Sequence, residues 1–213
     1  MGNNPGVKLF FIWFFLLSPF LFAMGGNDAS SSGQNSTPFD WYMTLIDPGG
    51  EPVDYSNSVA MPGGKPFKIS IASTIDCYSY VIVTSDAGSS KAYIYNSSLL
   101  PERNIRTIII NRMEAGSGKE FLSVIVTKDR QAELEKLIDI YRQQQTRTNF
   151  NKLEAEINRV KKENDSYNYK PGPIIPGGVG IRGGSGNMFF PPKNSRQFSG
   201  KSGYVWTFII NYQ

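Results

Sequence analysis

The strongest pattern in this 213-residue chain lies in residues 66–96, PFKISIASTIDCYSYVIVTSDAGSSKAYIYN. Three runs rich in β-branched and aromatic residues occur there, at 67–72, 78–84 and 91–95. The first alternates apolar and polar residues, which predicts a strand with one buried face. The second is apolar almost throughout, which predicts a central strand covered on both faces. Residues 85–90, between the second and third runs, are typical of a hairpin loop.

Four further runs outside this stretch have the composition of strands: 41–46, 105–110, 121–127 and 204–212. Short strands separated by turns favour an immunoglobulin-like antiparallel β-sandwich over a parallel α/β sheet, so we expect a mainly β fold. In the last run, alternate positions form an apolar and aromatic row: Tyr204, Trp206, Phe208, Ile210 and Tyr212. We expect this row to face the core and to close the sandwich.

The apolar period changes from two residues to about 3.6 between residues 129 and 164, which predicts helices. Two apolar stripes occur there, formed by Leu134, Leu137, Ile138 and Tyr141 and by Phe150, Leu153, Ile157 and Val160. Their phase slips over residues 143–148, so we expect a helical hairpin that is inserted before the last strand and capped by Asp129. One continuous helix is the alternative, because no Gly or Pro separates the stripes. We expect both stripes to pack within the protein, with a coiled coil to a partner as the other alternative.

The N-terminal composition predicts an exported protein. Residues 1–25 combine a basic start, an apolar run and small residues suited to cleavage after Gly25, which is typical of a signal peptide. An uncleaved N-terminal membrane anchor is the alternative. Residues 26–38 predict a flexible linker, and residues 39–213 a single β-sandwich domain. Within this domain, residues 170–203 are rich in Gly and Pro and predict a loop.

Cys77 is the single cysteine, and the chain contains no histidine. A lone cysteine excludes an intrachain disulfide and a structural zinc cluster. The lack of histidine excludes Ser-His-Asp and Cys-His catalysis and every histidine-ligated metal site. We therefore expect Cys77 to be a buried core residue, and we assign no catalytic, cofactor-binding or metal-binding residues. An exported module without disulfides favours the bacterial periplasm or cell surface.

Carboxylates are the remaining candidates for acid–base chemistry. Those in or beside the expected strands are Asp76, Asp86, Glu102, Glu114 and Glu120. The sequence gives no means of placing two of them at the separation that glycoside hydrolysis requires. The turn-like surroundings of Asp47 and Asp86 favour structural roles. We expect no enzymatic activity, with a carboxylate-based envelope enzyme as the alternative.

Two features towards the C-terminus could suggest ligands. The Gly-rich run 177–184 lacks the flanking strand, the helix and the Gly-Lys-Ser/Thr ending of a phosphate-binding loop. No basic–aromatic pattern indicates nucleic-acid binding, and export would separate the protein from nucleic acid. Residues 171–213 carry four basic and no acidic residues, which suggests peripheral membrane contact. A solvated loop with scattered charges is the simpler explanation.

Several short motifs from Pro66 onward follow a pattern known from one group of proteins. They are Pro66-Phe67, Asp76-Cys77-Tyr78-Ser79-Tyr80-Val81, Asp86 with Gly88, Ile94-Tyr95-Asn96 and Gly118-Lys119-Glu120-Phe121. Together they resemble a bacterial domain family of unknown function that occurs in secreted proteins and as an appendage to kinases and caspase-like peptidases. The resemblance extends to about Leu137, and the helical region and the Gly/Pro-rich loop depart from the family pattern. It implies a β-sandwich used as a binding or sensory accessory, and it transfers no catalytic residues.

These observations predict an exported, non-catalytic binding, scaffolding or assembly module of the bacterial cell envelope. The expected partner is an envelope protein or a surface polymer, without nucleic acid and without a cofactor. A carboxylate-based enzyme and a small outer-membrane-associated protein are the alternatives. The sequence identifies neither the ligand nor the oligomeric state.

Overall fold

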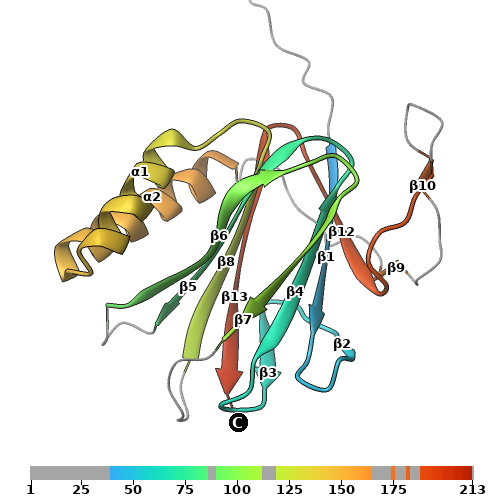
Figure 1. Ribbon diagram of the computed structural model, residues 1–213, viewed down its shortest axis with the longest axis horizontal. Coiled ribbons are helices and arrows are strands. Elements are labelled where there is room, and N and C mark those ends of the chain that lie inside the picture. Colours follow the sequence, from blue (N-terminus) through green and yellow to red (C-terminus); the bar gives the residue numbers. More distant parts are fainter. Residues whose placement is uncertain are drawn as a thin grey trace, which may run out of the picture. The chain divides into compact units, whose positions relative to one another are not determined.

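The computed structural model in Figure 1 describes residues 39–85, 90–111, 119–164, 174–175, 181–182 and 188–212. All of them belong to the structural unit Ser36–Gln213. The expected signal peptide, residues 1–25, and the expected linker, residues 26–38, lie outside the described residues. Both therefore stay predictions.

The apolar runs form two main sheets (Figure 1). The first has the strand order β7–β4–β1–β12–β9, with β2 paired to β1. Its strands are β1 (Phe39–Ile46), β2 (Pro52–Val53), β4 (Phe67–Ser73), β7 (Ile105–Ile110), β9 (Ile174–Ile175) and β12 (Ser195–Gly200). The second has the order β3–β13–β8–β5–β6. Its strands are β3 (Ser58–Met61), β5 (Cys77–Ser85), β6 (Ala92–Leu100), β8 (Lys119–Thr127) and β13 (Gly203–Tyr212).

Strand directions in the two sheets are mostly as expected. Neighbouring strands are antiparallel, apart from β3, which runs parallel to β13. A small additional ladder joins β10 (Ile181–Arg182) to β11 (Met188–Phe189). The fold is therefore mainly β and consistent with the expected sandwich, although the parallel edge departs from a purely antiparallel arrangement.

A hydrophobic core lies between the two sheets, because alternate side chains on each strand point towards the opposite sheet. From β1, Trp41, Met43 and Leu45 are fully buried in it. Trp41 stacks on Phe198 of β12 with the ring centroids 4.1 Å apart. An aromatic pair of this kind adds about 0.5–1.5 kcal/mol beyond the burial of its area.

The row of large side chains on the last strand faces this core, as predicted. Four of its members belong to the core: Tyr204, Phe208, Ile210 and Tyr212. The fifth, Trp206, is partly buried and packs against it. β13 pairs with β8 from Gly203 to Asn211 and so lies inside the second sheet.

Two helices follow β8: α1 (Ala132–Gln143) and α2 (Arg147–Asn164). The break between them falls within the predicted phase slip, so the alternative of one continuous helix is wrong. At the start of α2, the Thr146 hydroxyl accepts a hydrogen bond from the Asn149 backbone N–H at 3.2 Å. No helix in the described part of the chain is long and apolar enough to cross a membrane.

Asp129 does not cap α1, contrary to the expectation. The N-cap residue is Gln131, and it makes no side-chain capping bond. The Asp129 carbonyl instead accepts a hydrogen bond from the Thr127 hydroxyl at 2.8 Å. Residues 128–131 connect the end of β8 to the start of α1, so the helix begins later than the sequence pattern indicates.

A second core lies between the helices and the outer face of the second sheet (Figure 1). Both predicted stripes contribute, with Leu134, Ile138, Tyr141, Phe150, Leu153, Ile157 and Val160 buried and Leu137 packed against them. The sheet supplies Tyr80 and Ile82 from β5, Ile125 from β8 and Val205 from β13. β5 is thus covered on both faces, as its continuous apolar run predicts, because Val81 and Val83 point into the first core.

The segment between α2 and β13 differs from the expected loop at 170–203. It contains β9 to β12, and β12 pairs with β1 from Phe39↔Gly200 to Met43↔Arg196. The helical hairpin is therefore not followed directly by the last strand. The Gly and Pro content of the segment hid the strand Ser195–Gly200, whose Phe198 anchors it in the first core.

Candidate functional site

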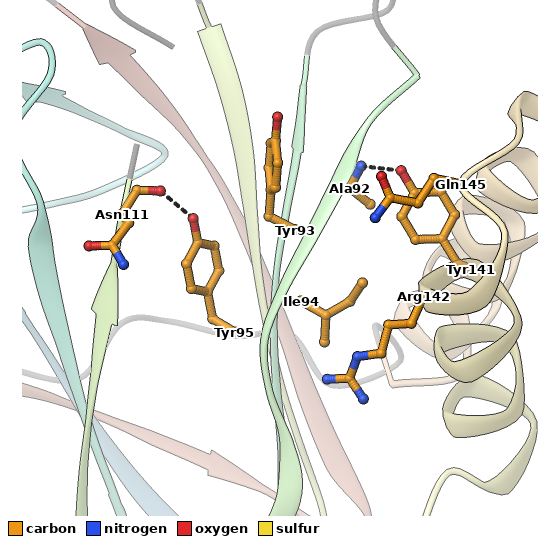
Figure 2. A pocket seen from close by; sticks show the side chains of 8 residues that line it. All are labelled: Ala92, Tyr93, Ile94, Tyr95, Asn111, Tyr141, Arg142 and Gln145. Carbon is orange, nitrogen blue, oxygen red and sulfur yellow. Dashed lines mark hydrogen bonds between the residues drawn. The ribbon is translucent and has the colours of Figure 1, made fainter. Parts of the chain in front are cut away.

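A pocket of about 290 Å³ opens where the edge strand β6 meets the end of α1 and the end of β7 (Figure 2). Its lining residues come from three places in the sequence and are Ala92, Tyr93, Ile94, Tyr95, Asn111, Tyr141, Arg142 and Gln145. Aromatic rings, side-chain amides and one guanidinium therefore meet at the free edge of the second sheet.

A β-bulge shapes the strand at this pocket. Val81 of β5 pairs with Asn96, whereas the next residue, Ile82, pairs with Ile94, so Tyr95 is the extra residue on β6. A bulge changes the direction of a side chain and locally bends the strand. Tyr93 and Tyr95 lie two residues apart and so share a face, on which both pack against the core between the two sheets.

Tyr95 closes the β7 side of the pocket. Its hydroxyl donates a hydrogen bond to the backbone carbonyl of Asn111, just beyond β7 (Figure 2). Burial raises the pKa of Tyr95 to about 12, and the nearby Glu120 carboxylate acts in the same direction. Tyr95 is therefore a neutral phenol that donates hydrogen bonds at physiological pH.

Tyr141 forms the α1 side of the pocket. Its hydroxyl accepts a hydrogen bond from the backbone N–H of Ala92 at 2.9 Å (Figure 2). Its ring contacts Phe150 of α2 edge to face, with centroids 6.4 Å apart. Arg142 is half exposed beside it and forms an ion pair with Asp139 at 3.5 Å. The ring of Tyr141 is thus fixed, while the guanidinium of Arg142 can reach a ligand.

The backbone of β6 also faces the pocket. The Ser85 N–H donates to the Lys91 carbonyl, which places that residue pair in a hydrogen-bonded position of the antiparallel ladder. Ala92 is the next residue, and its N–H points away from β5 to Tyr141. Because the pattern repeats every two residues, the N–H and C=O of Ile94 point to the same free edge. An edge of this kind can form main-chain hydrogen bonds with an added extended segment.

These groups suit recognition. Tyrosine rings supply rigid contact area at a small entropic cost, and their hydroxyls and the side-chain amides supply hydrogen bonds. Arg142 adds a charged donor that can pair with a carboxylate or phosphate group. Small-molecule and peptide sites commonly combine apolar walls with a few polar groups in this way.

Of the carboxylates considered for catalysis, the structure places Asp76 beside Glu102 and places Glu120 far from both. Asp76 precedes β5 and accepts a hydrogen bond from the Glu102 N–H at 2.7 Å. Glu120 lies at the other end of the same sheet, where it pairs with Ser85 and accepts a hydrogen bond from the Tyr212 hydroxyl. Ser85 lies nine residue steps along the strand from Asp76, which corresponds to about 30 Å. Asp86 and Glu114 lie outside the described residues.

Cys77 is fully buried in the core between the sheets, as expected. Burial raises the pKa of its thiol from 9.0 to about 11, despite a hydrogen bond with Ser73 that acts in the opposite direction. The thiol is therefore protonated at neutral pH and is a poor nucleophile.

The other residues considered from the sequence have structural surroundings. Asp47 begins a turn in which its carboxylate accepts a hydrogen bond from the Glu51 N–H at 2.9 Å. Arg196, one of the basic residues in 171–213, forms an ion pair with Asp54 and lies over the Tyr55 ring at 5.4 Å. Most of the Gly-rich run 177–184 lies outside the described residues. Among the residues that are described, no group of three acidic or cysteine side chains could hold a metal ion.

Comparison with known proteins assigns no role to the residues of this pocket. No protein-family model matches the chain, and searches of curated proteins and of solved structures found no match.

Proposed function

We propose that this chain is an exported, non-catalytic binding module of the bacterial cell envelope, with its ligand in the pocket between β6 and α1. The observation that supports the proposal most is that one pocket at the strand edge of β6 is lined by Tyr93 and Tyr95 from one side of the strand and by Tyr141 and Arg142 from the other. The partner is an envelope protein or a surface polymer. The resemblance to a bacterial family of secreted accessory domains agrees with this assignment.

We also propose that the sandwich is of the immunoglobulin-like type. The neighbours β1–β4–β7 correspond to strands A, B and E of that fold, and β13–β8–β5–β6 correspond to G, F, C and C′. In this scheme the helices and β9 to β12 are an insertion between strands F and G. Long connections between sandwich strands are common carriers of binding sites, because the rigid sheets hold them in place.

Affinity capture from envelope fractions tests the proposed site. We expect the wild-type chain to retain a specific envelope component and the double variant Tyr93→Ala/Arg142→Ala to lose it. Lys162→Ala is the matched control, because Lys162 is exposed at the far end of α2. Circular dichroism of each variant checks that the fold is intact.

The proposal fails if the double variant retains the same components as the wild type, or if the control loses them equally. The alternative, a carboxylate-based envelope enzyme, would lose its activity when the carboxylates are replaced. On the proposed function, the triple variant Asp76→Ala/Glu114→Ala/Glu120→Ala keeps the captured component, provided that it folds.

A further inference from the structure

The edge strand of the first sheet, β7, exposes an unusual amount of apolar surface. Its two outward isoleucines, Ile105 and Ile109, are 49% and 52% exposed. Thr107 lies between them on the same face, because alternate residues of a strand share a face. β7 pairs with β4 on one side and ends the strand order on the other. In the described part of the chain, therefore, nothing adds a strand to the free edge of β7.

This edge lacks the usual protection against strand pairing. Proteins commonly protect edge strands with outward charges, proline or a bulge. The sequence of β7 is IRTIII, in which Arg106 is the single charged residue. The Arg106 guanidinium points back to β6, where it donates to the Ser98 hydroxyl at 2.5 Å and to the Leu99 carbonyl at 2.7 Å. These hydrogen bonds hold the guanidinium against β6 of the second sheet, so it does not extend outward from the free edge of β7.

The exposed residues are complementary to themselves. If two copies of β7 pair in antiparallel fashion about a two-fold axis at Thr107, then Ile105 of each copy lies opposite Ile109 of the other. The two exposed isoleucines then cover each other on both sides of the axis. Arg106 would lie opposite Ile108, so no like charges meet across the pair. A symmetric contact of this kind is isologous and closes after two copies.

We propose that two copies of this chain associate through β7, with Thr107 at the two-fold axis. The inference is independent of the pocket at β6. A six-residue strand buries less than the roughly 800 Å² per partner of a standard interface, so the dimer is weak. We expect a dissociation constant on the order of 10–100 μM, which confinement of the chain at an envelope surface would offset.

Cysteine crosslinking tests the register directly, on the full chain purified in a mild detergent. Cys77 is buried, so an introduced surface thiol is the reactive one. In the proposed pair, the two Thr107 Cα atoms lie about 4.5–5.5 Å apart, within reach of a disulfide. The two Ile105 Cα atoms lie on the order of 13 Å apart. We expect Thr107→Cys to form a covalent dimer on mild oxidation, whereas Ile105→Cys does not.

Phe190→Cys is the matched control, because Phe190 is 52% exposed but precedes β12, on the other side of β1 in the sheet. The proposed register is wrong if Thr107→Cys crosslinks no better than Phe190→Cys or Ile105→Cys.

Sedimentation velocity over a range of concentrations tests the association itself. We expect the wild type to shift towards a dimer as its concentration rises, and Ile109→Lys to raise the dissociation constant about tenfold or more. Phe190→Lys should behave as the wild type. A wild-type chain that sediments as a monomer up to about 500 μM would overturn the proposal, as would equal effects of the two lysine variants.

Discussion

Tyr80 and Tyr141 attach the two ends of α1 to the second sheet through their hydroxyls. Tyr80 donates to Glu135 at 3.0 Å and accepts from the Gln131 N–H at 3.0 Å, at the start of the helix. Tyr141 accepts from the Ala92 N–H at the other end. The Ala92 N–H is buried and would otherwise have no hydrogen bond, which is costly. Two phenols thus fix the position of the helix that forms one wall of the pocket.

Removal of one hydroxyl should therefore weaken the protein measurably. Tyr141→Phe leaves the Ala92 N–H without its acceptor, and we expect the free energy of unfolding to fall by about 1–3 kcal/mol. Urea denaturation followed by circular dichroism measures this. Tyr78→Phe, a half-buried tyrosine on the same face of the sheet, is the control and should change stability by less than about 0.5 kcal/mol. Equal losses in the two variants would contradict the role assigned to Tyr141.

Cys77 makes the stability of the protein depend on alkaline pH. In the unfolded chain the thiol loses its proton from about pH 9, whereas burial keeps it protonated in the folded chain up to about pH 11. The unfolded state therefore binds fewer protons in this window, and the free energy of unfolding falls as the pH rises.

We expect this loss to be on the order of 2 kcal/mol between pH 9 and 11. Urea titrations at several pH values should show a smaller fall for Cys77→Ala than for the wild type. Tyrosines with raised pKa values, such as Tyr80, contribute to the fall in both proteins. Identical slopes would show that Cys77 ionises equally in both states.

At the scale of elements, the helical hairpin is held by its apolar stripes. Leu153 of α2 is fully buried in the second core, whereas its neighbour Lys152 is exposed. The two positions allow a test of whether packing or local helix propensity holds the hairpin in place.

Leu153→Ala should lower the free energy of unfolding by about 2–5 kcal/mol, because it leaves a cavity between α2 and the sheet. Lys152→Ala should stay within about 0.5 kcal/mol of the wild type. Hydrogen exchange should show faster exchange across both helices in Leu153→Ala. A similar small effect in both variants would mean that the hairpin is not packed as described.

The elements also show what the sequence could predict. The apolar runs of β4, β5, β8 and β13 and the slip between the stripes predicted strands and helices, because each signal is local. The pairing of β12 with β1 joins Phe39 to Gly200 and has no local signal. The bulge at Tyr95 and the contact of Tyr141 with Ala92, 49 residues away, likewise depend on long-range packing. For this reason the sequence predicted most strands and both helices but not the pocket between β6 and α1.

At the largest scale, the two sheets and the helical hairpin form three layers, with the second sheet in the middle. Its inner face packs on the first sheet and its outer face on the helices. In the described part of the chain, no strand pairs with the outer edges of β6 and β7, to which we assign the ligand pocket and the self-association. Binding and assembly would therefore use the edges of the sandwich and leave both cores intact.

Export is the prediction that concerns the whole chain. Small residues near position 25 favour cleavage by a signal peptidase, so the mature protein should begin at Gly26. N-terminal sequencing of the protein from an envelope fraction measures this. An intact Met1 in that fraction would favour the alternative of a membrane anchor.

The most direct test of the proposed function is photo-crosslinking in intact cells from the pocket itself. A photoreactive residue at Gln145, which lines the pocket and is exposed, should capture one specific envelope component. The same residue at Asn57, exposed next to β3 at the opposite edge of the second sheet, serves as the control and should not capture it. Capture that is equal at both positions, or absent at Gln145, would contradict a binding module with its site between β6 and α1.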